Sequence, residues 1–228
     1  MLRLLPVIVA IAYALVMWQF SARNLARQLN TQSHRLRDPG LEPVLARLAV
    51  ALGLREVPVH VYRVAPVNGL AAPDGRIFLT EGFLRLYQQG AVSAEELASV
   101  IAHELGHVAH GHSRRRMIDF SGQNVLRMML GTLLGRLVPF AGAWLAQTIA
   151  TALAARMSQR DEFEADEYAS ALLIKAGIGT APQIALFHKL DRLTGGKALP
   201  APAWLQSHPA TEARIRAIET NRDRWNAL

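Results

Sequence analysis

The sequence of 228 residues contains no cysteine, which excludes disulfide bonds and thiol catalysis. This absence does not fix the cellular compartment, because many proteins of oxidising compartments also lack cysteine. Internal repeats and low-complexity segments are absent as well. Acidic residues are fewer than basic ones: the chain has 18 Asp and Glu and 25 Lys and Arg, so the formal net charge is +7. Because no nucleic-acid-binding motif accompanies this charge, we expect an anionic lipid surface, and not nucleic acid, as the partner.

Hydrophobic residues are abundant. They make up 51% of the chain, and the mean hydropathy of +0.14 is high for a soluble protein. Residues 4–22 carry no charge, and this run is just long enough to span a bilayer as a helix. A cleaved signal peptide is the alternative, but Trp18 and Phe20 stand where the cleavage site would need small residues. We therefore predict an uncleaved transmembrane anchor over residues 1–22, followed by a polar helical linker over residues 23–40.

The most informative stretch for chemistry is residues 103–107, which read His-Glu-Leu-Gly-His and match the pattern H-E-x-x-H. On a helix His103 and His107 share one face, so their imidazoles can reach one metal ion. Glu104 projects beside them, where it can take a proton from a metal-activated water and pass one to the leaving amine. A capping box at residues 93–96 and apolar residues at helical spacing predict this helix. The alternative is a helix with two surface histidines.

The third metal ligand is the next question, because a hydrolytic zinc site usually has three protein ligands and one open position. A later segment offers Glu162 with Asp166 four residues on, so the two carboxylates share a helical face. Glu162 could bind zinc, and Asp166 could accept a hydrogen bond from the free ring N–H of a ligating histidine. Glu164 points away from that face. An ordinary acidic helix has the same spacing, and His110 is a rival ligand that we rank lower, since three ligands from one straight helix rarely converge.

Four segments in this order resemble the HtpX and type I CAAX prenyl protease family of membrane-associated zinc metallopeptidases. They are residues 68–82, residues 103–107, residues 162–166 and residues 207–209, and the resemblance covers roughly residues 41–220. The order and number of these segments make the resemblance more specific than any single motif.

The resemblance implies that one Zn²⁺ is bound by His103, His107 and Glu162 and that Glu104 is the catalytic base. It also places His208 near the metal. There the His208 side chain could donate a hydrogen bond to the oxygen of the tetrahedral intermediate, or it could block the open zinc position in a resting state. The resemblance leaves both roles open.

The expected fold class is α+β and predominantly helical, with a zincin-like metallopeptidase domain, a small β-sheet and the N-terminal anchor helix. Alternation predicts a strand over residues 57–64 and a hairpin that pairs residues 70–72 with residues 76–80. An edge strand beside a metal helix can bind an extended peptide through main-chain pairing, although plain sheet structure explains the pattern equally well. Gly69 departs from the family, which more often has Ala there.

Residues 117–157 form an apolar tract that we predict to be a helical insert within a metallopeptidase domain of residues 41–228. Its uncharged part could be a second transmembrane helix. If the chain crossed the membrane once here, His107 and Glu162 would lie on opposite sides and could not share a metal ion. Two crossings would require the first half of the tract to span the membrane as well, but that half contains charged and polar residues. We favour a helical pair that packs on the domain or lies at the membrane surface.

The sequence thus predicts a membrane-anchored zinc endopeptidase that hydrolyses polypeptide substrates in a bacterial-type inner membrane, with a role in membrane protein quality control. Basic residues follow the anchor, and because such residues tend to stay on the cytoplasmic side of a membrane, they weakly favour a cytoplasmic catalytic domain. The alternative is a non-proteolytic, chaperone-like membrane module with a structural zinc. Glu104 argues against that alternative, because a structural site needs no base.

Overall fold

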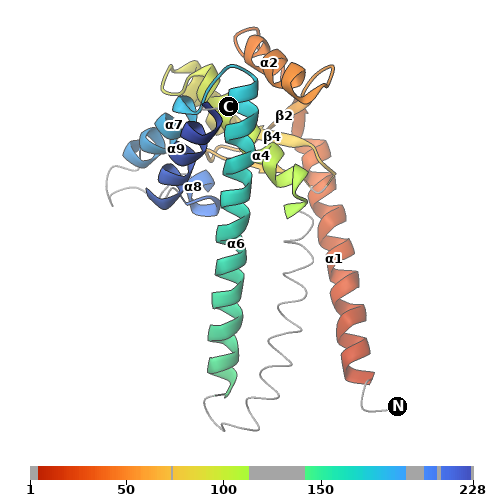
Figure 1. Cartoon of the computed structure of the whole chain (residues 1–228). Helices are drawn as coiled ribbons and strands as arrows, with labels where there is room; N and C mark the ends of the chain where they lie inside the picture. The colour runs from red at the N-terminus through yellow and green to blue at the C-terminus, as the bar shows by residue number, and fades with distance from the viewer. Residues whose placement is uncertain (1–4, 73, 113–141, 194–202, 210–211, 227–228) are drawn as a thin grey trace. The chain divides into compact units, whose positions relative to one another are not determined.

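The computed structural model describes residues 5–72, 74–112, 142–193, 203–209 and 212–226 (Figure 1). By their contacts the described residues form two compact units. The larger unit contains those in Leu29–His110 and Glu162–Leu228, and the smaller unit contains those in Met1–Gln28 and Gly111–Asp161.

The larger unit is built on a four-stranded mixed sheet with the order β1-β2-β4-β3. The strands are β1 (Ser33–Arg35), β2 (Val59–Tyr62), β3 (Gly69–Ala71) and β4 (Ile77–Thr80). β2 pairs parallel with β4, whereas β1 and β3 pair antiparallel with β2 and β4 at the two edges. All four residues of β4 are buried, as expected for a central strand covered on both faces.

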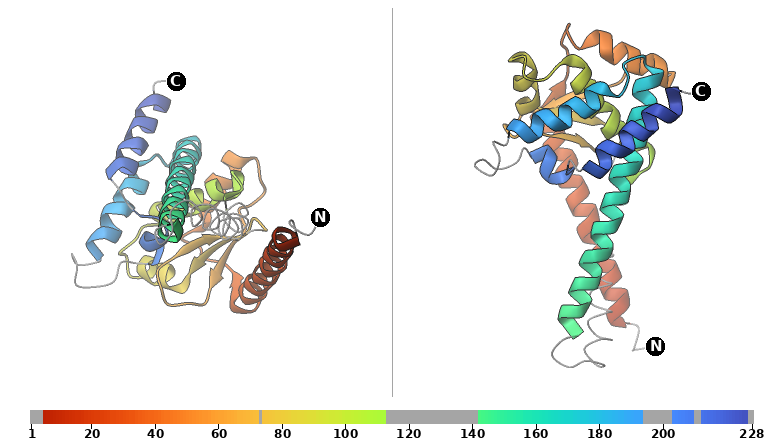
Figure 2. Two further views of the ribbon diagram at one scale, coloured as in Figure 1. Left: turned by 90° about the horizontal axis from the view of Figure 1, so that it is seen from below. Right: turned by 60° about the vertical axis from the view of Figure 1, so that its left-hand side comes forward.

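Helices cover this sheet and supply the rest of the core. They are α2 (Glu42–Leu52), α3 (Glu81–Gln88), α4 (Ala94–Ala109), the part of α6 (Gly142–Lys175) from Glu162 onward, α7 (Ala181–Leu193), α8 (Ala203–Ser207) and α9 (Glu212–Asn226). α4 packs against β3, α2 and α7. α7 and α9, light and dark blue in Figure 2, lie side by side, and the Arg214 guanidinium of α9 lies 4.8 Å from the centroid of the Phe187 ring of α7.

Most of the predicted elements in the larger unit are confirmed, as is the α+β class with its small sheet. α4 begins at the predicted capping box. α2 ends at Leu52 and is capped by Gly53, whose φ of 69° lies in the left-handed region that favours glycine. The hairpin forms from β3 and β4. In the C-terminal region a short helix, α8, precedes His208, and α9 runs from Glu212 to Asn226.

The N-terminal helix α1 (Leu5–Gln32) extends through the predicted anchor into the predicted linker. The linker does not stay helical to its end, because Ser33–Arg35 form the edge strand β1, which the sequence reasoning missed. Within the described residues, no helix combines the length and the apolar character that a membrane crossing requires. The transmembrane anchor therefore stays a prediction. The predicted insert of residues 117–157 lies outside the described residues up to position 141, and its remainder belongs to α6.

Candidate metal centre

Helix α4 carries the two histidines of the motif and is fixed at its start by the capping box. The Ser93 side chain accepts from the Glu96 backbone N–H at 3.1 Å, and the Glu96 carboxylate accepts from the Ser93 N–H at 2.7 Å. One face of the helix is buried in the core, and it includes His103 and His107, each 2% exposed. Their Nε2 atoms lie 3.1 Å apart. Helical spacing thus brings the two imidazoles to one point, as the motif predicts.

Gly106 allows α6 to approach this helix closely. A Cβ atom at position 106 would lie 2.8 Å from the backbone oxygen of Ala165 and 2.9 Å from its Cα. Both atoms are backbone of α6, so they could not move aside without moving the helix. Because Gly106 has no side chain, the α6 face that carries Glu162 and Asp166 lies directly against the histidines.

Four buried side chains form what we call the donor cluster: His103, His107, Glu162 and His208 each offer one ligand atom, and these atoms all lie within 4.8 Å of one another. The Nε2 atom of His103 lies 3.4 Å from Glu162 Oε2, and that of His107 lies 3.5 Å from Glu162 Oε1. Two ligand atoms held tetrahedrally at the zinc bond lengths of about 2.0–2.2 Å are separated by about 3.3–3.6 Å. The spacing of the cluster therefore fits a zinc ion.

Asp166 fixes the tautomer of His103. Its Oδ1 lies 2.9 Å from His103 Nδ1, and since a carboxylate can only accept, Nδ1 carries the proton and Nε2 is turned to the cluster. Burial opposes a charge on His103, but the hydrogen bonds to Asp166 and Glu162 raise its pKa to about 9. Burial likewise opposes a charge on Glu162, yet His103 and His208 hold its pKa below the usual range. Such a site attracts positive charge, which a metal cation would supply in place of the proton.

Arg214 of α9 holds Asp166 from the other side. Its Nε donates to Oδ2 at 2.6 Å and its Nη2 to Oδ1 at 2.9 Å, a bidentate pair, and the arginine is only 2% exposed. Its Nη1 also donates to the Pro209 backbone oxygen at 2.8 Å. Burial opposes charge on Asp166, but Arg214 first and then the hydrogen bond from His103 keep the pKa of Asp166 below its ordinary value. One guanidinium thus connects the carboxylate that orients His103 with the backbone next to His208.

Glu104 lies beside the donor cluster and is 1% exposed. Its Oε1 accepts a hydrogen bond from the Trp204 indole N–H at 3.3 Å and lies 3.6 Å from His208 Nε2. His208 turns its other nitrogen, Nδ1, to Glu162 Oε2 at 2.8 Å. In this arrangement His208 is part of the donor set itself, and the carboxylate of Glu104 stands next to it.

Comparison with known proteins decides the family. The sequence model described as Peptidase family M48 matches residues 35–222, most of the chain. The chain belongs to peptidase family M48. It is 32% identical over 187 residues to Metalloprotease LoiP of Escherichia coli strain K12, covering 80% of this chain and 70% of LoiP. It is 31% identical to Metalloprotease YcaL of the same strain over 178 residues, or 76% of this chain and 67% of YcaL.

A more distant relative is the mitochondrial metalloendopeptidase OMA1 of Schizosaccharomyces pombe, 28% identical over 77% of this chain and 50% of OMA1. Membership of family M48 confirms the predicted zinc metalloendopeptidase, a hydrolase with Zn²⁺ as its cofactor, and agrees with the resemblance to the HtpX-like proteases. It speaks against the alternative of a non-proteolytic module.

Two residues considered in the sequence lie outside the donor cluster of this M48 protease. His110 is the C-cap residue of α4 and is exposed, with its ring edge-on to that of Tyr168 at a centroid distance of 6.1 Å. Glu164 is half-buried, whereas Glu162 and Asp166 on either side are 3% and 1% exposed. Helical geometry turns Glu164 away from the donor cluster, and its carboxylate lies within 4.8 Å of a ring nitrogen of His110 instead.

Three residues of the site were missed by the sequence reasoning: Gly106, Trp204 and Arg214. A glycine inside a helix costs about 1 kcal/mol relative to alanine, so Gly106 within the motif was a readable signal of close packing. Arg214 and Trp204 gave no such signal, because an arginine on a polar helix and a tryptophan in a short segment fit many environments.

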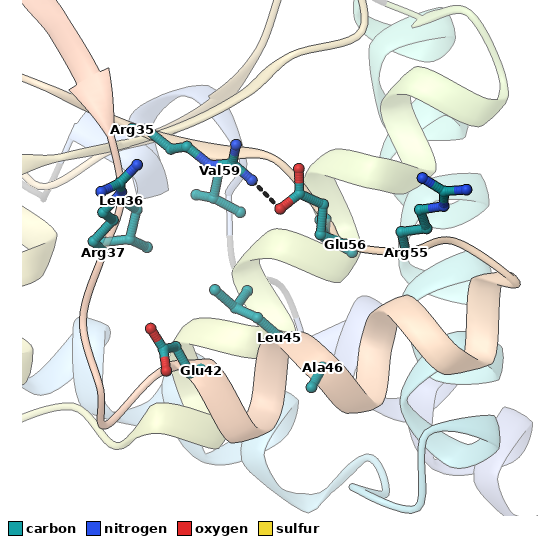
Figure 3. A pocket seen from close by; sticks show the side chains of 10 residues that line it. Arg35, Leu36, Arg37, Glu42, Leu45, Ala46, Arg55, Glu56 and Val59 are labelled. Atoms are coloured by element: carbon teal, nitrogen blue, oxygen red, sulfur yellow. Dashed lines mark ion pairs between the residues drawn. The ribbon is translucent and has the colours of Figure 1, made fainter.

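The larger unit also has a cavity of about 590 Å³ that shares no residue with the donor cluster (Figure 3). It is bordered by α2 and by the segments around β1 and β2, and an ion pair joins Arg35 to Glu56 at its wall. Its other charged side chains are Arg37, Glu42 and Arg55. The cavity is therefore not part of the metal centre.

Proposed function

We propose that this M48 protein is a membrane-anchored zinc endopeptidase in which His103, His107 and Glu162 hold the metal. Asp166 orients His103, and Glu104 is the catalytic base. One observation carries this assignment: the Nε2 atoms of His103 and His107 lie 3.1 Å apart, and they lie 3.4 and 3.5 Å from the two carboxylate oxygens of Glu162. These separations are close to the roughly 3.3–3.6 Å between two ligand atoms of a tetrahedral zinc ion.

Each residue of this set has a defined task in peptide-bond hydrolysis. Bound Zn²⁺ supplies Lewis acidity, which makes water a competent nucleophile near neutral pH and polarises the scissile carbonyl. The Glu104 carboxylate takes the proton of the attacking water and later delivers it to the leaving amine nitrogen. Asp166 accepts from His103 Nδ1 and keeps Nε2 turned to the cluster. The burial of all these groups excludes bulk water and strengthens their electrostatic interactions.

His208 acts as a resting-state latch in this proposal. Its Nδ1 completes a set of four donors, and a site with four protein ligands has no open position for water. Movement of His208 away from Glu162 would free the fourth position. Arg214 and Trp204 are the groups that restrain this movement, since Arg214 bonds to the Pro209 carbonyl oxygen and the Trp204 carbonyl oxygen accepts from the His208 N–H at 2.7 Å.

The ligand set is tested by zinc stoichiometry after competition with a chelator. Glu162→Ala should lose zinc steeply, and Asp166→Ala should bind about 10–100-fold more weakly because it removes only the group that orients His103. Glu164→Ala is the matched control on the same helix and should retain zinc like the wild type. His110→Ala should retain zinc as well. Loss of zinc from His110→Ala together with its retention by Glu162→Ala would show a different ligand set.

The role of Glu104 is tested by casein cleavage in detergent. Glu104→Gln preserves the shape of the side chain and removes its basicity, so zinc and fold should be retained while hydrolysis falls by about 10²–10⁴ or more. If this variant lost its zinc instead, Glu104 would be a ligand or a structural group.

The membrane anchor is supported by the apolar side chains that α1 exposes. Tyr13, Val16 and Phe20 are 66%, 65% and 59% exposed, an arrangement that suits contact with lipid. Reporters fused after Arg37 and after Leu228 should occupy the same compartment, and the basic residues after the anchor favour the cytoplasm. Opposite compartments would place His107 and Glu162 on different sides and exclude the shared site.

The substrate of this endopeptidase is a polypeptide, and we propose that it pairs with the edge strand β3. This strand lies against α4, and a Cβ atom at Gly69 would come within 3.4 Å of Glu104 Oε1. A peptide extended along β3 would therefore pass the catalytic base. A role in membrane protein quality control is consistent with an M48 relative named beta-barrel assembly-enhancing protease, from Escherichia coli strain K12.

A further inference from the structure

Trp204 is the largest of the fully buried side chains among the described residues, and its ring lies against the metal centre. The ring is edge-on to that of His103 at a centroid distance of 5.8 Å and tilted by 36° to that of His208 at 5.6 Å. Its indole N–H does not point into the apolar core but donates to Oε1 of Glu104 at 3.3 Å. A buried indole needs such an acceptor, and here the acceptor is the residue assigned as the base.

The ring is held in place from three directions. It stacks on Phe187 of α7 at 5.6 Å with an interplanar angle of 27°, and Phe83 of α3 meets it at 6.3 Å and 70°. The Trp204 backbone N–H donates to the Val67 carbonyl oxygen, just before β3, at 2.9 Å. An indole with only two side-chain torsions that is packed in this way has little freedom. Its N–H is therefore a fixed donor relative to α4.

We propose that Trp204 is a positioning residue for peptide hydrolysis: its indole N–H holds one oxygen of Glu104 and leaves the other to take the proton. A base must be kept within hydrogen-bond reach of that proton, and small misplacements cost rate. Glu104 has three side-chain torsions, and a hydrogen bond to one oxygen removes the rotations that would carry the other out of reach. The inference rests on the proposed function, in which Glu104 is the base.

The hydrogen bond can be tested without zinc and without activity. The indole N–H resonances of the four tryptophans are recorded by NMR on the full chain in detergent and with chelator present. The Trp204 resonance is identified by its absence in Trp204→Phe or by contacts to the Phe187 ring. Glu104→Gln replaces a charged acceptor with a neutral one, so this proton should move upfield while the other three stay in place. An unmoved Trp204 resonance would overturn the inference.

The catalytic consequence is tested by separating kcat from KM. Trp204→Phe keeps an aromatic ring and lacks only the donor, so kcat should fall about 10- to 100-fold, as for loss of a hydrogen bond to a charged group. KM and zinc stoichiometry should stay near wild type. Phe83→Leu is the matched packing control: it loosens the same ring but keeps the N–H, so it should lower the melting temperature and reduce kcat much less than Trp204→Phe does. Equal kcat values in the two variants would show that Trp204 acts through packing alone.

Failure of this inference is distinguishable from failure of the proposed function. An active Glu104→Gln enzyme would refute Glu104 as the base whatever Trp204 does. An inactive Glu104→Gln enzyme together with a fully active Trp204→Phe enzyme would refute the positioning role alone. If both roles are correct, adding Trp204→Phe to Glu104→Gln should cause no further loss of activity, because the two residues act as a unit.

Discussion

Replacing the buried Arg214 with methionine should destabilise the protein strongly. The substitution keeps an unbranched side chain but removes the bidentate hydrogen bonds to Asp166, whose carboxylate is 1% exposed. Breaking a buried ion pair by removing one partner costs about 3–5 kcal/mol, because the other charge is left unpaired. Total stabilities of domains are about 5–15 kcal/mol, so this loss is a large fraction. For a domain of this size it corresponds to a melting temperature lower by about 6–20 °C.

The measurement is thermal unfolding of the full chain in detergent with a chelator present, so that bound zinc does not contribute to stability. The double variant Asp166→Asn with Arg214→Met is the control. It removes the unpaired charge of Asp166, though not that of Glu162, which lies 3.3 Å from Arg214 Nη1, and it should recover part of the stability that Arg214→Met loses. Zinc affinity of Arg214→Met should also fall about 10–100-fold, because Asp166 no longer holds His103 in one orientation. A wild-type melting temperature for Arg214→Met, or a double variant less stable than the single one, would refute this reasoning.

Three further outcomes are expected. Gly106→Ala places a Cβ atom 2.8 Å from the Ala165 backbone oxygen, so it should lower the free energy of unfolding by about 1–3 kcal/mol and weaken zinc binding. A wild-type melting temperature together with wild-type zinc retention against a chelator would contradict the close approach of α4 and α6. His208→Ala removes the fourth donor, so casein cleavage should rise at unchanged zinc stoichiometry, whereas a fall would indicate that His208 assists the reaction. The pKa of Asp166 is lowered in the folded state, so its contribution to stability is present above about pH 4 and is lost as the pH falls through the folded pKa. The free energy of unfolding of the metal-free protein should therefore decrease in acid. The double variant Asp166→Asn with Arg214→Met should show a smaller decrease.

The metal helix was predictable because its signals are local. A capping box sets where α4 begins, apolar residues at helical spacing set its buried face, and the repeat of the helix brings His103 and His107 together. The pairing of Glu162 with Asp166 follows from the same repeat. Helical geometry therefore accounts for which side chains of each helix share a face without any knowledge of the neighbouring elements.

The edge strand β1 could not be predicted in this way. Its three residues, Ser33, His34 and Arg35, show no apolar alternation, and they are extended because they pair antiparallel with β2. The helix α8 is a similar case, since the burial of Trp204 against Phe187 and Glu104 holds a segment that has little helical signal of its own. In both segments contacts distant in the sequence outweigh local preference.

The two histidines of the motif and the helix that carries them follow from the amino-acid sequence alone, because they depend on residues within a few helical turns. Which distant groups complete the metal centre depends on the packing of the helices. It brings Arg214 of α9 onto Asp166 and Trp204 of α8 onto Glu104, across 48 and 100 residues of chain. Such contacts depend on how helices pack, and no local periodicity encodes which polar side chain will meet which. A buried carboxylate must find a partner, but the sequence alone does not say which residue supplies it.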